Sequence, residues 1–213
     1  MSNEVSGAAV ADGRARRWEQ HNAERRAALV DSCLRAIRAH GAGVAMDDIA
    51  AEARTSKTVF YRHFTDRAGL YRAVAEKVGR RIERALRDVL GGLVGDSGAG
   101  PGVSRADLLA VVEAYLALAE ADPEVYRFVV RPPALEGRVA EREVVGITDR
   151  AAEVLADWFA GSVGERRAQV WSVAIVGSVH ACADRWLAEP SALSREELVD
   201  DLVDLAWSGL GRS

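Results

Sequence analysis

The stretch SKTVFYRHF, at residues 56–64, concentrates side chains that can bind an anion or form hydrogen bonds. Two of them are cationic and the others hold hydroxyl or imidazole groups: Ser56, Lys57, Thr58, Tyr61, Arg62 and His63. Side chains of these types on one short helix suit the major groove of DNA, where base edges and phosphate oxygens lie within reach. The segment is therefore a candidate recognition helix.

A helix this short needs neighbours, because isolated helices below about 12 residues are marginal in water. Phe60 and Phe64 supply an apolar side that can pack on other helices, and Ser56 can cap the N-terminus. Apolar periodicity predicts a first helix over residues 18–40 and a second, two-turn helix over residues 46–53. Three helices with a tight break before the third describe a helix-turn-helix.

The stretch MDDIAAEARTSKTVFYRHFTDRAGLYRAVAE, at residues 46–76, resembles the DNA-binding signature of the tetracycline-repressor (TetR) family of bacterial transcription regulators. The matching positions are Ile49-Ala50, Ser56, Tyr61, Phe64, Arg67 and Leu70-Tyr71. The resemblance covers residues 25–75, and beyond them the chain agrees with the family only in its helical pattern and length. It implies a homodimer that docks two recognition helices on a near-palindromic operator in double-stranded DNA.

The resemblance and the chemistry together predict a set of DNA-binding residues: Met46, Arg54, Ser56, Lys57, Thr58, Tyr61, Arg62, His63 and Arg67. Arg54 occupies the turn where the family usually has glycine, and a positive φ there costs another residue on the order of 1 kcal/mol. Ala45 stands where the family usually has a serine or threonine that caps the second helix and contacts a phosphate. Arg14, Arg16 and Arg17 either reach DNA from an N-terminal tail or remain solvated.

The rest of the sequence predicts an all-α fold with about nine helices. A long helix is expected from Arg67 to Leu90, and a flexible glycine-rich connector over residues 91–102. Further helices are expected over residues 104–121, 123–130, 139–160, 164–187 and 194–209. Three parts result: a flexible tail (1–17), a helix-turn-helix domain (18–66) and, as the resemblance implies, a domain for ligand binding and dimerisation (67–213).

In the family, the last two helices form a four-helix bundle across the two-fold axis of the dimer. The sequence supports this with a seam of small residues followed by an apolar seam, both at helical spacing: Ala174, Gly177, Ser178, Ala181, then Leu198, Leu202, Leu205 and Gly209. Small residues allow close helix approach, and the apolar face is wider than one side of a small core needs. Burial within the same chain is the alternative.

The resemblance also implies a cavity for a small-molecule effector among the C-terminal helices. The candidate lining residues are aromatic: Tyr115, Tyr126, Phe128, Trp158 and Trp171. Aromatic side chains also build ordinary cores, so each can belong to either. The helical faces of residues 104–187 are dominated by Val, Leu, Ala and Trp, which favours a hydrophobic effector. Repression is the majority behaviour of the family and is the expected mode of action.

The charge distribution agrees with an N-terminal anion-binding site. Net charge is −4 over the whole chain, but residues 1–64 hold ten basic and eight acidic residues, a balance of +2. Residues 65–213 hold 18 basic and 24 acidic residues, a balance of −6. The N-terminal part is therefore the better partner for DNA phosphates.

Other classes of protein find little support. The chain lacks a secretory signal and any long apolar run, and its two cysteines, Cys33 and Cys182, have no metal-type spacing, so a cytoplasmic protein without a membrane partner is expected. His180 and Asp184 stand one helical turn apart, but the sequence nominates no further metal ligand. No catalytic residues, metal or cofactor are predicted. A helical protein-interaction module with a non-functional helix-turn-helix is the alternative function.

Overall fold

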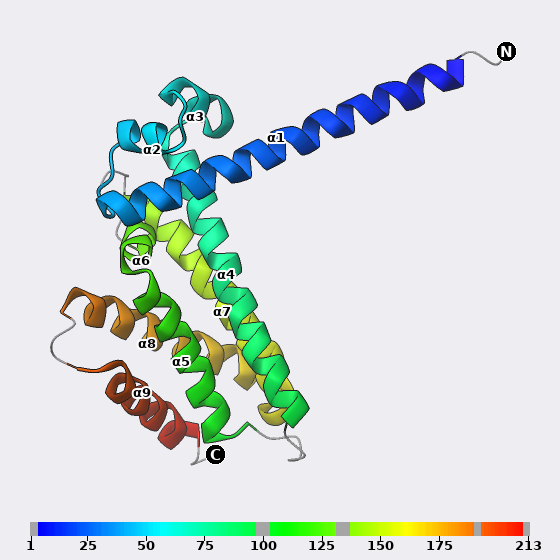
Figure 1. Cartoon of the computed structure of the whole chain (residues 1–213). Helices are drawn as coiled ribbons and strands as arrows, with labels where there is room; N and C mark the ends of the chain where they lie inside the picture. Colours follow the sequence, from blue (N-terminus) through cyan, green and yellow to red (C-terminus); the bar gives the residue numbers. More distant parts are fainter. Residues whose placement is uncertain (1–3, 97–102, 131–136, 190–192, 211–213) are drawn as a thin grey trace.

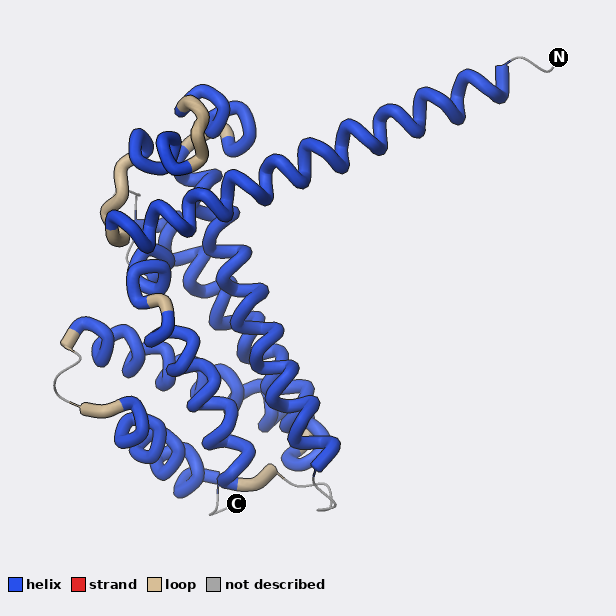
Figure 2. Tube along the Cα trace, viewed as in Figure 1, coloured by secondary structure: helices blue, strands red, loops and turns tan. Residues whose placement is uncertain are grey.

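The computed structural model describes residues 4–96, 103–130, 137–189 and 193–210, and all of their regular structure is helical (Figures 1 and 2). The elements are α1 (Glu4–His40), α2 (Met46–Glu52), α3 (Lys57–Phe64), α4 (Arg67–Asp96), α5 (Arg105–Ala121), α6 (Pro123–Val130), α7 (Gly137–Val163), α8 (Glu165–Ala188) and α9 (Arg195–Leu210). The predicted all-α fold with about nine helices is confirmed.

Two predicted boundaries were wrong. Helix α1 begins at Glu4, so residues 4–17 continue the helix where a flexible tail was expected, and it projects from the body in Figure 1. Helix α4 continues through Gly91 to Asp96 instead of ending at Leu90. The remainder of the expected connector, residues 97–102, lies outside the described residues.

Helices α1 to α3 pack around the two phenylalanines of α3. Phe60 is 1% exposed and Phe64 is 4% exposed, with their ring centroids 6.1 Å apart. The guanidinium of Arg26, on α1, lies 4.8 Å from the centre of the Phe64 ring. Ile49 of α2 is buried in the same core. The predicted anchoring role of Phe60 and Phe64 is confirmed, because their burial supplies the stability that a helix of eight residues lacks alone.

The junction between α3 and α4 is tight and depends on a glycine. Thr65 ends α3 with a φ of 69°, and the Asp66 carboxylate accepts a hydrogen bond from the Gly69 amide at 2.6 Å. A β-carbon added at Gly69 would overlap the backbone carbonyl oxygen of Phe64. This close approach fixes the direction in which α4 leaves the recognition helix.

The C-terminal helices form one bundle below α1 in Figure 1. Helix α4 runs beside α7, α7 packs along α8, and α5 lies between the rest of the bundle and α9 (Figure 1). Ser104 caps α5 through a capping box with Asp107. Ser194 and Glu197 exchange the equivalent pair of hydrogen bonds at the start of α9, so a capping box begins this helix too.

Helix α6 joins the two parts of the molecule. Arg38 of α1 donates two hydrogen bonds to the Asp122 carboxylate, at 2.6 and 2.9 Å. The backbone amide of Ala42 donates to Glu124 at 2.9 Å. Tyr71 of α4 donates its hydroxyl hydrogen bond to the carbonyl of Val129. The DNA-binding helices are therefore attached to the C-terminal bundle at α6 and at the residue that precedes it.

Replacing Gly69 by alanine should destabilise the protein by about 1–3 kcal/mol, the usual cost of forcing an extra carbon into a packed site. Gly91→Ala, at an exposed helical position with open space around it, should instead raise the free energy of unfolding by about 0.5–1 kcal/mol. Urea denaturation of both variants measures the difference. Equal stability of Gly69→Ala and the unmodified protein would contradict the close approach.

Candidate functional site

The turn between α2 and α3 adopts the backbone conformation expected of a helix-turn-helix despite its arginine. Arg54 has a φ of 50°, and the Thr55 amide donates to the carbonyl of Ala50 at 3.0 Å. The predicted positive φ is confirmed. Ala45 leaves α2 without a side-chain cap, as expected, but Ser56 also makes no cap hydrogen bond although it occupies the N-cap position of α3. The predicted capping role of Ser56 was therefore wrong.

The polar side of α3 is exposed, while its phenylalanines are buried. Ser56, Lys57, Thr58 and Arg62 are exposed, and so is the ring of Tyr61, at 42%. Arg54, in the turn before α3, is exposed as well. The exposure fits contacts to base edges and phosphates, but their assignment as DNA ligands stays a prediction.

Neighbouring groups shift the pKa values of two side chains of α3, Lys57 and His63. The Lys57 ammonium lies 2.8 Å from the Asp47 carboxylate, and this hydrogen bond raises the pKa of Lys57. Burial lowers the pKa of His63, and the positive charges of Arg62, Arg25 and Arg26 lower it further. The Nε2 atom of His63 is buried without a hydrogen-bond partner among the described residues. His63 therefore favours the neutral form in the free protein.

Two of the predicted DNA-binding residues, Met46 and Arg67, make contacts within the protein. Met46 is 8% exposed and its side chain belongs to the core, so a contact of this residue with DNA stays a prediction that the burial of its side chain does not support. An apolar first residue of a two-turn helix packs inward here because α2 lies directly on α1. Arg67 donates a hydrogen bond to the carbonyl of Val44 at 3.1 Å, which holds the loop before α2.

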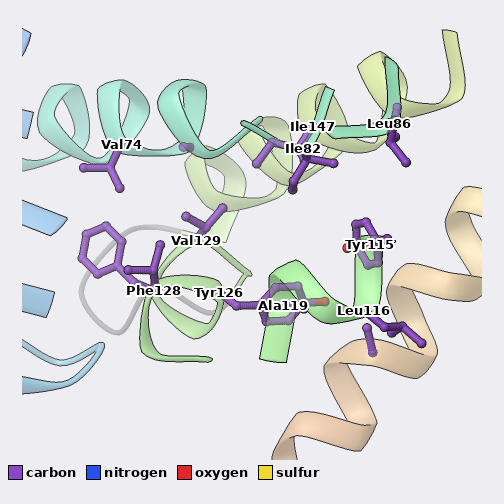
Figure 3. Packing of buried hydrophobic residues seen from close by; sticks show 14 of the residues in the cluster. Val74, Ile82, Leu86, Tyr115, Leu116, Ala119, Tyr126, Phe128, Val129 and Ile147 are labelled. Carbon is purple, nitrogen blue, oxygen red and sulfur yellow. The ribbon is translucent and has the colours of Figure 1, made fainter. Parts of the chain in front are cut away.

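Two narrow cavities lie among the C-terminal helices. The inner cavity, of about 20 Å³, has walls of apolar side chains from α4, α5, α7 and α8 and is bounded by Tyr115. The outer cavity, of about 40 Å³, is bounded by Tyr115 and Tyr126 and by the ion pair of Arg81 and Asp122. Figure 3 shows both tyrosines among the buried residues between α4 and α5. Each cavity holds room for a few water molecules at most.

A polar cluster forms around Tyr115, the residue that lines both cavities. The Tyr115 hydroxyl lies 3.0 Å from Nδ1 of His180, and the Tyr126 hydroxyl lies 3.4 Å from the same atom. Burial raises the pKa of Tyr115 to about 12, so its hydroxyl stays protonated. Burial also lowers the pKa of His180, although the charge of Asp184 acts in the opposite direction. The cluster is therefore a set of hydrogen-bonding groups inside an apolar surrounding.

The other predicted pocket residues lie elsewhere. Phe128 packs on Tyr71 with ring centroids 5.7 Å apart, and Figure 3 places it away from Tyr115, on the side toward α1. Trp158 contacts Phe159, and the guanidinium of Arg167 lies over the ring of Trp171 at 5.8 Å. None of the three borders the inner or the outer cavity. The sequence could not show that His180 joins Tyr115 and Tyr126, because the three are far apart in the chain.

Some residues of the predicted dimer seam are exposed on the surface, and others are buried in the core. On α8, Ala174, Gly177, Ser178 and Ala181 are all exposed in the single chain. Val170 and Val173, which the sequence analysis did not single out, extend this face and are 64% and 62% exposed. They could have been found because they continue the same helical spacing toward the N-terminus of α8.

The seam on α9 was partly wrong. Leu198 and Leu202 are 7% and 6% exposed, because this side of α9 packs on α5 within the chain. Leu205, by contrast, is 70% exposed. Gly209 lies in α9 beyond the residues whose surroundings the structure describes. The alternative of a core within the same chain is therefore correct for Leu198 and Leu202.

The described residues offer neither a metal-binding cluster nor a membrane-spanning helix. They contain no group of three or more potential metal ligands, and His180 instead serves the tyrosine cluster. Among the same residues, no helix combines the length and apolar character of a membrane span.

An exposed polar helix on a buried aromatic anchor, joined by a tight turn to α2, defines a helix-turn-helix DNA-binding protein. Residues 29–74 match the family described as bacterial regulatory proteins of the tetR family, and residues 97–213 match a tetracyclin repressor-like C-terminal domain. The chain belongs to the TetR family of bacterial transcription regulators, as its sequence motif indicated.

Relatives extend over almost the full chain. An uncharacterized HTH-type transcriptional regulator of Mycobacterium tuberculosis is 34% identical over 205 residues, which covers 93% of this chain and 82% of the relative. The transcriptional activator FasR of Mycolicibacterium smegmatis is 27% identical over 173 residues, which covers 80% of this chain and 74% of FasR.

Solved structures share the fold. A TetR-like regulator from Rhodococcus sp. RHA1 is 25% identical, with a TM-score of 0.60 over 89% of this chain and 97% of the other. FadR from Bacillus subtilis, solved in complex with stearoyl-CoA, is 17% identical, with a TM-score of 0.59 over 85% and 97% of the two chains. At that identity the second comparison shows the fold alone.

Replacing Arg54 by glycine should raise stability and weaken DNA binding at once. Glycine adopts the positive φ freely, so the free energy of unfolding should rise by up to about 1 kcal/mol. Loss of a phosphate-neutralising charge should lower the slope of log affinity against log salt by about one. Arg54→Lys keeps both the charge and the strain and is the control. An unchanged salt slope in Arg54→Gly would show that Arg54 lies away from the DNA.

Proposed function

We propose that this chain is a homodimeric, ligand-responsive transcriptional repressor that a hydrophobic small molecule releases from a near-palindromic operator. The observation that carries the proposal is the exposed polar surface of α3, held in place by the buried Phe60 and Phe64. Residues 18–66 supply the DNA-binding domain, and residues 67–213 supply the ligand-binding and dimerisation domain. A DNA partner places the protein in the cytoplasm.

On the operator, each side chain of α3 has a role that its position supports. Lys57 and Thr58, in the first turn, face base edges, since recognition helices present their N-terminal residues to the major groove. Tyr61, Arg62 and His63 bind phosphate oxygens on the flanking backbone. Lys57 must exchange its contact with Asp47 for a contact with DNA. Asp47 therefore limits affinity and restricts the free lysine to one orientation.

The effector enters the space between α4, α5, α7 and α8. The apolar walls of the inner cavity support a hydrophobic molecule, and the tyrosine–histidine cluster orients any polar group that it carries. Because the two cavities hold only about 20 and 40 Å³, binding requires these helices to separate. The effector thus selects a wider state of the bundle. Helix α6, which borders the outer cavity through Val125 and Tyr126, transmits the change to α1.

Selection of operator DNA from a random duplex library tests the proposal, with affinities then measured by gel shift at rising salt. Lys57→Ala should weaken operator binding by about tenfold or more, the usual effect of losing a charged contact. Asp47→Asn should strengthen binding, because it frees Lys57 and removes a negative charge beside the phosphates.

The exposed, ion-paired Arg87 on α4 supplies the control, and Arg87→Ala should bind as the unmodified protein does. If no duplex is enriched in the selection, the proposal of a repressor is rejected. The alternative, a helical protein-interaction module with a non-functional helix-turn-helix, is then favoured. If the selected operator stimulates transcription when occupied, the protein is an activator, as FasR is named.

The exposed face of α8 should form the dimer interface. Ala174→Glu places a charge in the middle of this face, so it should give monomers in analytical ultracentrifugation and lose operator binding by more than about tenfold. Gly92→Glu, at an exposed position on α4, should remain dimeric. Leu202→Asp is unsuitable, because Leu202 belongs to the core and its loss unfolds the chain. A dimeric Ala174→Glu variant would place the interface elsewhere.

A further inference from the structure

A broad groove lies where α1 crosses α4, and its chemistry differs from that of the two cavities. It has a volume of about 560 Å³ and is lined by six basic residues and one acidic residue, Asp31. The basic residues come from both helices: Arg26, Arg38, Lys77, Arg80, Arg81 and Arg84. Most of α4 runs below α1 in Figure 1, on the side away from α2 and α3. We call this space the basic groove.

The positive charges of the basic groove exceed the nearby acids that partner them. Lys77 pairs with Asp31, and Arg80 pairs with Glu76 at 2.5 Å. Arg38 and Arg81 share a single acid, Asp122, at 2.6 and 3.9 Å, and Arg81 keeps 56% of its side chain exposed. No ion pair joins Arg84 to another described residue. A groove with this balance attracts an anion.

The basic groove, the outer cavity and the inner cavity adjoin one another in a row, because neighbouring spaces share lining residues. Val78, Arg81 and Val125 line both the basic groove and the outer cavity. Tyr115 lines both the outer and the inner cavity. Along this row the lining changes from mostly basic side chains in the groove, past Tyr115 and Tyr126, to side chains that are apolar except for Tyr115. A single molecule that spans the row therefore has an anionic end and a hydrocarbon end.

We propose that the effector is an amphipathic anion, with an alkyl chain in the inner cavity and a phosphate-bearing head in the basic groove at Arg81 and Arg84. A phosphate suits the groove because its oxygens accept several charge-assisted hydrogen bonds from guanidinium groups. The hydroxyls of Tyr115 and Tyr126 stand beside the junction of chain and head. This inference rests on the proposed function, since it names the chemical class of that effector.

The same placement explains how the effector acts on DNA binding. The head lies between α1 and α4, the two helices that hold α3, and beside Arg38 and Asp122, which join α1 to α6. An anion in the groove competes with Asp122 for Arg38 and Arg81. The ligand therefore separates the bundle with its chain and loosens the attachment of α1 with its head.

Three small probes test the proposal directly: decyl phosphate, decanol and inorganic phosphate, each below micelle-forming concentrations. Isothermal titration of the full chain should show decyl phosphate binding at least about tenfold more tightly than decanol, and inorganic phosphate binding more weakly than either. Decyl phosphate should also release the selected operator at lower concentration than decanol.

Arg84→Gln should weaken the binding of decyl phosphate by about tenfold and leave the binding of decanol unchanged. The variant would then bind the two probes with nearly equal affinity. Arg87→Gln, one turn further along α4 and outside the basic groove, should keep the full advantage. Equal affinity for decanol and decyl phosphate overturns the anionic head but leaves a hydrophobic effector intact. Equal affinity for inorganic phosphate and decyl phosphate would overturn the proposal that an alkyl chain of the effector binds in the inner cavity. Titration needs no operator, so failure to find one bears on the proposed function alone.

Discussion

Asp122, between α5 and α6, and Glu124, in the first turn of α6, hold the DNA-binding helices on the ligand-binding bundle. Asp122 accepts two hydrogen bonds from Arg38, and Glu124 accepts one from the backbone of Ala42. The Asp122 side chain is only 12% exposed, so its contact with a guanidinium is stronger than an open surface pair. Since α1 in turn holds α3 through Phe64 and Arg26, the orientation of the recognition helix depends on these two carboxylates.

This arrangement makes the protein suited to two states. The bundle that receives the effector is closed around narrow cavities, and α6 borders the outer one directly. Widening the bundle therefore acts on α6, which carries Glu124 and directly follows Asp122. A ligand shifts such an equilibrium only through its differential affinity for the two states, which here comes from the space that the wider state provides. No long chain of intermediate contacts is required, because the effector site and the attachment of α1 share α6.

Sequence patterns were sufficient where neighbouring residues decide the structure. The helical period of apolar residues predicted the helices, and the spacing of Phe60 and Phe64 predicted the anchor of α3. Patterns failed where a distant element decides. Leu198 and Leu202 are buried by α5, and the contact of Tyr115 with His180 joins residues far apart in the chain. The basic groove likewise appears only when α1 crosses α4. Gly69 drew no attention because nothing in its local sequence shows the carbonyl of Phe64 beside it.

The most direct measurement of the central claim is a hydroxyl-radical footprint of the purified protein on a selected operator. A symmetric dimer with one recognition helix per subunit should protect two patches on one face of the duplex, about one helical turn apart, or about 34–36 Å. The two patches should be related by the two-fold symmetry of the operator. A single protected patch, or uniform protection without a preferred position, would contradict the account of a dimer that reads DNA with α3.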